Sequence, residues 1–367
     1  MTMLDPAPAI AREVFGIMPD GRPVERVSLR AAGGFEARII AYGAALQSLI
    51  VPDAEGRCDD VVLGHDGLEG YLGRRNFFGA TVGRYANRIA NARFVLDGET
   101  IRLPANDGAH ALHGGPDGFD RQIWQIAEIE GGAEPSVTFA HVSADGEQGY
   151  PARLDVRVTY RLTGPAELSL GFSARADRPT IVNLTNHSFF NLEGAGSGAD
   201  ILEHRLTVAA DRFLAIDPGA IPLPEPPRAV GGTPFDFRTA CAVGARIRRD
   251  DVQLRHGKGY DHNFCLGAVH EPRFAARLEA PRSGRTLELL TDQPGLQVYS
   301  GNYLDGSISG KHGRLYRQSD GICLEPQMWP DAPNRPDFPG ARLTPDDVYR
   351  HNTVYRFVPA GAAVGGI

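Results

Sequence analysis

The chain has 367 residues, of which 42% are apolar, and a formal net charge of −7. Acidic and basic residues are mixed along the chain and form no basic block, which argues against nucleic acid as a partner. No apolar run approaches the roughly 18 residues of a membrane span, so we expect no membrane partner either.

The N-terminal part of the chain has neither the basic stretch nor the apolar stretch of a secretory signal, and we therefore expect a cytoplasmic protein. Residues 1–12 are expected to be frayed. Residues 93–103 predict a hairpin, because Asp97-Gly98 at its centre suits the positive φ angles of a two-residue turn. Residues 153–162 alternate strictly between apolar and polar side chains, residues 167–174 repeat the alternation, and together they predict a second hairpin.

The central part of the chain continues the strand pattern. Residues 183–192 alternate as well, and the set of positions that includes His187 is polar but uncharged, as in the wall of a hydrogen-bonding pocket. The proline-rich segment 216–237 lies between stretches with similar strand patterns, so we expect a long ordered loop over one end of a sandwich rather than a linker between domains. Residues 277–290 predict a third hairpin.

The last part of the chain holds one predicted helix. Residues 344–349 predict it, because Thr344 can cap it and Pro345 suits its first turn. The tail, residues 359–367, is expected to be frayed. The four cysteines form no CxxC pair, and we expect them to be reduced and mostly buried. Successive hairpins with little helix predict an all-β fold, a large antiparallel sandwich or barrel, in one domain that spans residues 1–367.

An acidic residue at the end of one predicted strand raises the question of a site. In the stretch 321–327, Glu325 lies on the face opposite the aliphatic residues, and Pro326 indicates that the strand is at an edge or ends there. Three other predicted strands carry polar residues in a similar way, at His187, Asp261 and Gln297. Each of these could be a surface group or a satisfied buried group, but together they indicate a shared polar cleft.

The spacing leaves the chemistry of this cleft open. A metal site is not favoured, because His110 and His113 cannot share a strand face and the chain has no HExxH motif. No GxSxG motif supports a nucleophile, and the glycine-rich "HGGPDG" lacks the lysine and helix of a phosphate loop. Two carboxylates, Asp261 and Glu325, could hydrolyse a glycoside, whereas a histidine with Glu325 could exchange protons in a concerted way.

Six motifs give a more specific indication, because they resemble the successive motifs of the aldose 1-epimerase (galactose mutarotase) family. They occur in the family's order and extend from about residue 36 to residue 357. They are "GATVGRYANRIANARFVLDG", "ALHGGPDGFDRQIW", "NLTNHSFFNLEG", "DHNFCL", "GLQVYSGNYLDG" and "GICLEPQMWPDAPNRPDFP".

The resemblance implies a single-domain antiparallel β-sandwich, the mutarotase-like supersandwich, with a concave cleft for a free monosaccharide. It implies that Glu325 is the general base, His187 the general acid, and His113 a second histidine that binds and polarises the sugar near its ring oxygen. It also implies residues that hold the sugar hydroxyls: Arg88, Asp261 and Gln297, with Asn87 as a further contact. Arg88 and Asn87 point to opposite faces of an ideal strand, so a bulge or turn must bring both to one site.

The implied reaction interconverts the α and β anomers of free aldoses such as D-glucose and D-galactose. An ionised Glu325 takes the proton of the anomeric hydroxyl while a protonated His187 donates one to the ring oxygen; the ring opens, rotates about C1–C2 and closes again. No metal or cofactor is expected. An epimerase of phosphorylated sugars and a non-catalytic carbohydrate-binding protein remain as alternatives. The preferred aldose (galactose, glucose, xylose or arabinose) and the choice between monomer and homodimer also remain open.

Overall fold

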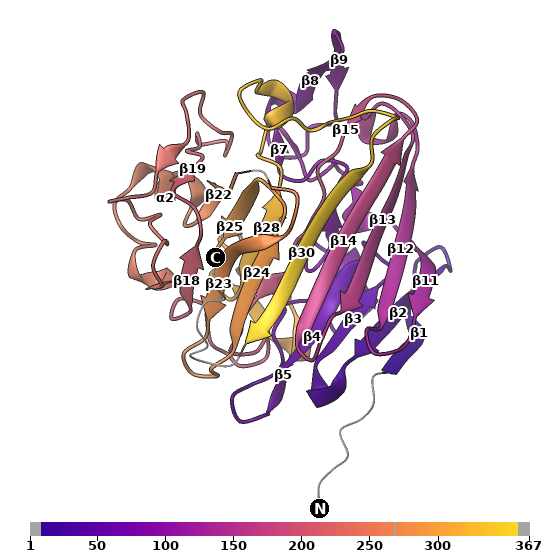
Figure 1. Ribbon diagram of the computed structural model, residues 1–367, viewed down its shortest axis with the longest axis vertical. Helices are drawn as coiled ribbons and strands as arrows, with labels where there is room; N and C mark the ends of the chain where they lie inside the picture. The colour runs from indigo at the N-terminus through magenta and orange to yellow at the C-terminus, as the bar shows by residue number, and fades with distance from the viewer. Residues whose placement is uncertain (1–8, 268, 359–367) are drawn as a thin grey trace, which may run out of the picture.

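The structure is a computed structural model that describes residues 9–267 and 269–358, and nearly all of its regular elements are strands (Figure 1). The strands pair antiparallel in every sheet, which confirms the predicted antiparallel all-β fold. The described residues contain two short α-helices, α1 (Leu68–Leu72) and α2 (Val252–Gly257).

The described residues form three large sheets and five two-stranded ribbons. The nine-stranded sheet contains, in spatial order, β11 (Gln125–Glu130), β12 (Ser136–Ser143), β13 (Leu154–Leu162), β14 (Glu167–Ala176), β30 (Tyr349–Val358), β24 (Thr286–Thr291), β23 (Arg273–Glu279), β18 (Arg205–Val208) and β21 (Cys241–Ala242). The five-stranded sheet contains β1 (Ala9–Ile17), β2 (Pro23–Arg30), β3 (Glu36–Ile40), β4 (Ala45–Pro52) and β5 (Cys58–Asp60). The six-stranded sheet contains β17 (Phe189–Phe190), β28 (Ile322–Gln327), β25 (Gly295–Tyr299), β22 (Asp261–Cys265), β19 (Arg212–Phe213) and β20 (Arg228–Ala229). The ribbons pair β7 (Arg88–Ile89) with β10 (Ala111–Leu112), β6 (Thr81–Val82) with β16 (Thr185–Asn186), β8 (Arg93–Leu96) with β9 (Glu99–Arg102), β15 (Thr180–Ile181) with β29 (Arg342–Leu343), and β26 (Asp305–Ser309) with β27 (Leu315–Arg317).

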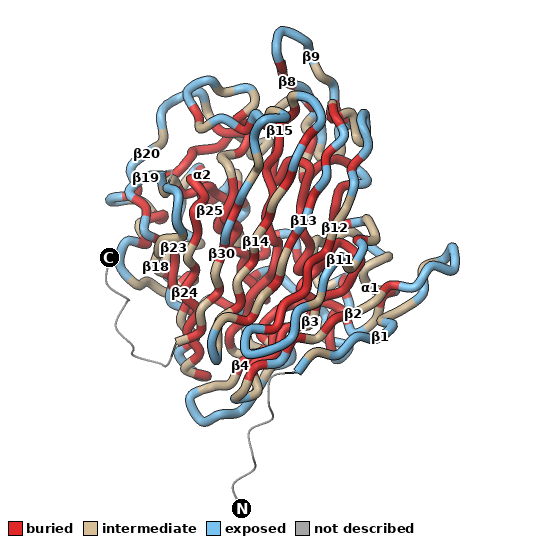
Figure 2. The backbone as a smooth tube through the Cα atoms, turned by 45° about the vertical axis from the view of Figure 1, so that its right-hand side comes forward, coloured by how far each residue is buried: buried red, intermediate tan, exposed pale blue. Residues whose placement is uncertain are grey.

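The nine-stranded sheet is one layer of a sandwich, and the other two large sheets pack on its inner face (Figure 1). The Tyr160 hydroxyl of β13 donates to the carbonyl oxygen of Ala44, just before β4, at 2.8 Å. The ring of Phe190 on β17 packs against Tyr355 of β30 with centroids 5.1 Å apart. Along β13 every second side chain is buried, as strict alternation requires, and Figure 2 shows buried and more exposed residues alternating along this sheet.

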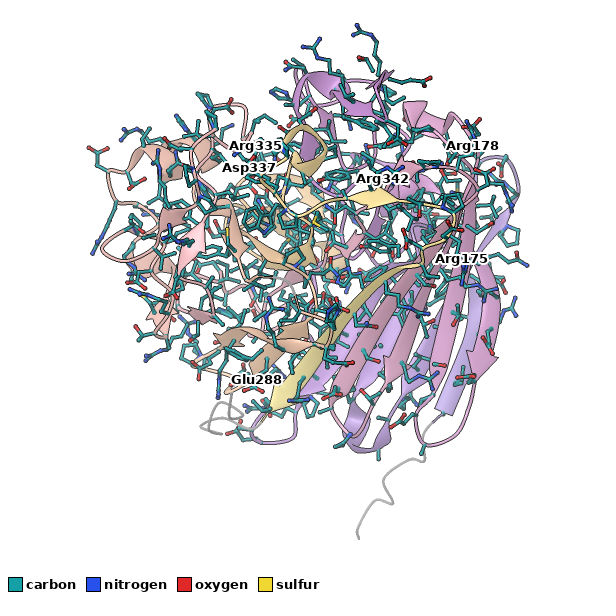
Figure 3. All side chains as sticks on the ribbon, turned by 45° about the horizontal axis from the view of Figure 1, so that its top comes forward. Arg175, Arg178, Glu288, Arg335, Asp337 and Arg342 are labelled. Atoms are coloured by element: carbon teal, nitrogen blue, oxygen red, sulfur yellow. The ribbon has the colours of Figure 1, made fainter. Side chains whose placement is uncertain are left out.

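The three predicted hairpins are confirmed as β8–β9, β13–β14 and β23–β24. At the first turn Asp97 and Gly98 have φ angles of 49° and 90°, which is the left-handed conformation expected there. Arg342 of β29, labelled in Figure 3, anchors this hairpin through an ion pair of 2.9 Å with Asp97.

The prediction of one strand over residues 183–192 is wrong, because this segment forms two short strands with different partners. β16 pairs with β6, and β17 pairs with β28. Between them the Asn186 side chain accepts hydrogen bonds from the backbone N–H and the hydroxyl of Ser188, which turns the chain at His187. The sheet alternation therefore ends at His187.

Two further predictions about chain segments are wrong. The predicted helix at 344–349 is a single turn, in which the Thr344 hydroxyl donates to Asp347, because Tyr349 already begins the central strand β30. The expected fraying of residues 1–12 does not extend to residue 9, since β1 begins at Ala9 and Arg12 pairs with Glu25 at 2.7 Å. Residues 1–8 and the tail 359–367 lie outside the described residues.

The proline-rich segment 216–237 is ordered, as predicted, and is a loop except for the short edge strand β20. Its residues Val230, Phe235 and Phe237 are buried in the main core. A second loop, which follows β28, contacts it through the guanidinium of Arg335, which donates to the Leu223 carbonyl. All four cysteines are unpaired, but only Cys323 among them is fully buried and Cys58 is exposed, so the prediction of mostly buried thiols is wrong. Within the described ranges no helix is long and apolar enough to cross a membrane.

Candidate active site

Three of the four polar residues predicted to share a cleft, Asp261, Gln297 and Glu325, lie on strands of the six-stranded sheet, and His187 joins them from the turn before β17. On β28, Ile322 and Leu324 are buried in the main core, while Cys323 and Glu325 lie on the opposite face. Gln297 of β25 lies directly beside Glu325 in the strand register. β28 ends at Gln327, one residue after Pro326, as the missing N–H of proline suggested.

Loops complete a cavity of about 210 Å³ over this face. That volume is below the ~300–1,000 Å³ typical of sites for drug-sized ligands, and therefore suits one small polar molecule. The cavity wall includes every site residue predicted from the sequence: Asn87, Arg88, His113, His187, Asp261, Gln297 and Glu325. Their convergence was the central expectation from sequence.

Glu325 and His187 face each other in this cavity. Nε2 of His187 is 3.7 Å from Oε1 of Glu325, and both side chains are almost fully buried. The other oxygen, Oε2, is buried and accepts no hydrogen bond from any described residue. Burial, with a smaller contribution from the negative charge of Asp261, raises the pKa of Glu325 well above its usual value, although Arg88 acts in the opposite direction.

Two aromatic rings and a thiol pack against the imidazole of His187. The Phe77 ring stacks on it with centroids 5.5 Å apart and planes inclined by 23°, and Phe189 packs at 5.0 Å. Nδ1 lies 3.5 Å from Sγ of Cys323. Burial lowers the pKa of His187 to about 4, so the ring favours its neutral form.

His113 lies in the loop after β10, where the chain has a φ angle of 50°. The backbone N–H of Asn87 donates to its Nδ1 at 3.2 Å, which places the hydrogen of the neutral ring on Nε2. Burial, reinforced by neighbouring cationic groups, lowers the pKa of His113 well below its usual value. Gly114 is required next to it, because its φ is 82° and a Cβ there would overlap the carbonyl oxygen of Gly83.

The turn that must bring Asn87 and Arg88 to one site is present. Asn87 has a φ of 66°, and its side-chain oxygen accepts the N–H of Arg88. Nε of Arg88 donates to Asp107 at 2.8 Å. Burial lowers the pKa of Arg88, but the negative charges of Asp261 and Asp107 raise it by more. The guanidinium therefore stays charged.

Asp261 and Gln297 form a hydrogen-bonded pair at the floor of the cavity. The Gln297 amide donates to Oδ1 of Asp261 at 2.7 Å, and its own oxygen is buried without a donor among the described residues. Burial raises the pKa of Asp261, while Arg88 and Gln297 lower it. The pair therefore offers acceptors to a ligand that carries hydroxyl groups.

Sequence reasoning missed the loop after α1, which adds Arg74, Arg75 and Phe77 to the cavity wall. Arg75 is fixed by a two-point hydrogen-bonded pair with Asp120, and its guanidinium lies 4.5 Å from the Phe77 ring. Phe77 itself has a φ of 61°, which is uncommon for a bulky side chain. The loop has no strand or helix periodicity, so the sequence gives no signal for it.

Comparison with known proteins agrees with this geometry. The family model described as aldose 1-epimerase matches residues 25–356. Galactose mutarotase from Bos taurus is 46% identical over 95% of this chain and 98% of its own length. Aldose 1-epimerase from Escherichia coli is 39% identical over 97% of this chain and 99% of its own length. The crystal structure of an aldose epimerase homologue from C. elegans is 30% identical, covers 92% of this chain and 99% of its own, and superposes with a TM-score of 0.83. The chain thus belongs to the aldose 1-epimerase family and is an epimerase.

Proposed function

We propose that this mutarotase interconverts the α and β anomers of free aldohexoses such as D-glucose and D-galactose, with Glu325 as base and His187 as acid. The observation that carries the proposal is the separation of 3.7 Å between Nε2 of His187 and Oε1 of Glu325, on the wall of a cavity of about 210 Å³. Two proton-transfer groups at that separation can serve the anomeric hydroxyl and the ring oxygen of one pyranose, because both oxygens are bonded to the same carbon.

Ring opening moves two protons. Glu325 takes the proton of the anomeric hydroxyl, and the oxygen forms the carbonyl of the open-chain sugar. The C1–O5 bond breaks, and its electron pair takes a proton from Nε2 of His187. Rotation about C1–C2 turns the other carbonyl face towards O5, and the same two groups return the protons as the ring closes. Each positioned acid or base contributes typically ~10²–10⁴-fold to such a reaction.

The protonation states of the free pair differ from those expected from the sequence. An ionised Glu325 with a charged His187 was expected, but burial favours the neutral carboxylic acid and the neutral imidazole. In both arrangements the pair carries one proton, which lies on His187 in the charged form and on Glu325 in the neutral form. The neutral arrangement is the one that accompanies the open-chain sugar, so burial lowers the energy of that intermediate relative to the charged state before ring opening.

The remaining cavity residues would orient the sugar. His113 presents Nε2–H as a donor, which suits the ring oxygen or a neighbouring hydroxyl. The charged Arg88, the Asp261–Gln297 pair and Asn87 would bind the other hydroxyls, because sugars offer both donors and acceptors. The apolar wall at Phe77 and Tyr299 would cover the sugar ring and exclude water.

A free sugar fits this cavity better than a sugar phosphate. Among the residues that the structure describes, its wall contains three arginines, and each has an aspartate partner: Arg74 with Asp305 at 2.7 Å, Arg75 with Asp120 at 2.6 Å, and Arg88 with Asp107 at 2.8 Å. Glu325 and Asp261 add further acidic groups. A doubly charged phosphate would meet no surplus of positive charge.

Polarimetry of freshly dissolved α-D-glucose, α-D-galactose, D-xylose and L-arabinose tests the proposal, with glucose 6-phosphate as the comparison. The protein should speed the approach to the anomeric equilibrium of at least one free aldose well beyond the rate in buffer. Sugar binding without acceleration, measured by calorimetry, would instead show a carbohydrate-binding protein and contradict the proposal. Faster conversion of glucose 6-phosphate than of every free aldose would contradict the substrate class.

A further inference from the structure

The imidazole of His187 presents its two ring nitrogens to different neighbours. Nε2 lies 3.7 Å from Oε1 of Glu325, beside the cavity, and Nδ1 lies 3.5 Å from Sγ of Cys323. Cys323 is fully buried and is not part of the cavity wall, so its thiol does not meet the sugar. No other described side chain forms a hydrogen bond with Nδ1. The proton transfers derived above use Nε2 alone and give the thiol no role.

The proposed reaction requires one particular neutral form of His187. In the charged ring both nitrogens carry a hydrogen, and Nε2 donates its hydrogen to the ring oxygen of the sugar. The neutral ring that remains therefore carries its hydrogen on Nδ1, and the lone pair of Nε2 can take the proton back as the sugar closes. A neutral ring with its hydrogen on Nε2 has no lone pair there. The tautomer of a histidine is set by the hydrogen bond of its other nitrogen, so Nδ1–H requires an acceptor.

The thiol of Cys323 fits the role of this acceptor. A thiol is a weak donor and a weak acceptor, so the distance alone allows either direction. As a donor the thiol would place the ring hydrogen on Nε2, and His187 could then act as the acid only if the thiol proton moved onto Nδ1. That step would leave a buried thiolate. Burial, with the negative charges of Glu325 and Asp261, opposes it by raising the pKa of Cys323 well above its usual value.

The same contact selects the orientation of the ring. Phe77 and Phe189 pack against the imidazole and restrain its plane. A half-turn about the Cβ–Cγ bond would keep that plane but exchange Nδ1 with Cδ2 and Nε2 with Cε1. A carbon would then face Glu325, and no proton could pass between the base and the acid. Since Nδ1–H is a better donor to sulfur than Cδ2–H, the contact with Cys323 favours the orientation that points Nε2 at Glu325.

We propose that Cys323 is a positioning residue for the acid: its sulfur accepts the hydrogen of Nδ1 and thereby leaves Nε2 of the neutral His187 free to exchange the shared proton. The residue acts through His187 and does not touch the sugar. Strand β28 thus carries both the base and the group that orients the acid, because Cys323 and Glu325 are two residues apart and share a strand face. The effect on the reaction rate rests on the proposed function, whereas the tautomer of His187 does not.

The tautomer is measured by NMR of the protein labelled with nitrogen-15 in its histidines, because a ring nitrogen that carries a hydrogen resonates far from one with a lone pair. His187 is identified among the 11 histidines by the loss of its signals in His187→Asn. At neutral pH the wild type should carry the hydrogen on Nδ1, and Cys323→Ala should shift the hydrogen towards Nε2. Leu63→Val is the matched control, because it removes a methylene from the same hydrophobic cluster outside the cavity wall and should leave the tautomer unchanged.

Polarimetry with α-D-galactose separates positioning of the acid from sugar binding. In Cys323→Ala, kcat should fall roughly 2–10-fold, as expected for one lost hydrogen bond, with KM unchanged within about twofold, and Leu63→Val should keep both values. An unchanged tautomer or an unchanged kcat in Cys323→Ala would overturn the proposal. If this variant does not fold, a wild-type ring with its hydrogen on Nε2 is sufficient to refute it. The expected tautomers in a protein without mutarotase activity would support the contact of Cys323 with Nδ1 and contradict the proposed function.

Discussion

Replacement of Glu325 by glutamine tests the assigned base most directly. Glutamine has nearly the same shape, so the packing of β28 should be kept, but its amide cannot take the anomeric proton. The structure places the expected loss near the upper end of the ~10²–10⁴-fold range for a positioned base, which corresponds to about 4–5.5 kcal/mol in the activation free energy. The neighbouring carboxylate of Asp261 cannot easily substitute, since Gln297 and Arg88 already engage it.

The same substitution should leave stability unchanged or slightly increased. Glu325 is a buried ionisable group with one oxygen that lacks a donor among the described residues, so a neutral amide removes a desolvation cost. The assay is polarimetry of α-D-galactose and α-D-glucose, corrected for mutarotation in buffer, with thermal unfolding measured in parallel. Glu55→Gln is the control, because its side chain is 61% exposed and lies outside the cavity. A Glu325→Gln rate within about threefold of the wild type, at equal thermal stability, would refute the assignment of the base.

Further predictions concern the pH profile, the sugar contacts and the loop of His113. Activity should fall below about pH 4, the pKa of His187, because the pair then takes up a second proton, and it should fall again above the raised pKa of Glu325, where the pair loses its only proton. Circular dichroism at each pH controls for unfolding. A rate that keeps rising below about pH 4 would contradict the shared proton. Arg88→Gln should raise the KM for galactose by ~10–100-fold, because one charge-assisted hydrogen bond is worth roughly 1.5–3 kcal/mol, and an unchanged KM in initial-rate polarimetry would exclude a sugar contact. Gly114→Ala should lower the unfolding free energy by more than about 1 kcal/mol in urea titrations, since the new Cβ would overlap Gly83 in a left-handed conformation, and an unaltered midpoint would show that the loop adapts.

The sheet framework could be predicted because it depends on local patterns. Strict alternation along residues 153–162 identifies one buried and one exposed face, and Asp97-Gly98 fixes a hairpin through its backbone preferences. Both signals are contained in a few neighbouring residues. The segment 183–192 shows the limit of such reasoning, since its alternation is regular but the Asn186 side chain ends the pairing by binding Ser188. The end of the strand depends on a side-chain hydrogen bond that competes with strand pairing, and the pattern of apolar and polar residues does not reveal this bond.

The candidate site residues can be predicted from motifs, but their surroundings cannot. His187 and Glu325 carry recognisable sequence contexts, whereas Phe77 reaches His187 from a loop without periodicity. The convergence of these groups requires long-range pairing. The loop after α1, the turn at Asn87 and four strands of the six-stranded sheet meet at one cavity. Their pKa values depend on this burial, and for that reason the sequence suggested a charged pair where the structure favours a neutral one.

Burial of the pair is consistent with the reversibility that a mutarotase needs. Each turnover opens the ring and closes it again, so a strong preference for either position of the shared proton in the sugar complex would slow one of these two steps. In the free protein the buried site favours the proton on Glu325, as the two opposite pKa shifts require. A bound sugar would add hydroxyl dipoles that partly solvate the charged arrangement and bring the two states closer in energy. In an exposed pair with ordinary pKa values of about 4.3 and 6.5, a single shared proton would instead lie on the histidine, and ring opening would then have to neutralise two well-solvated ions.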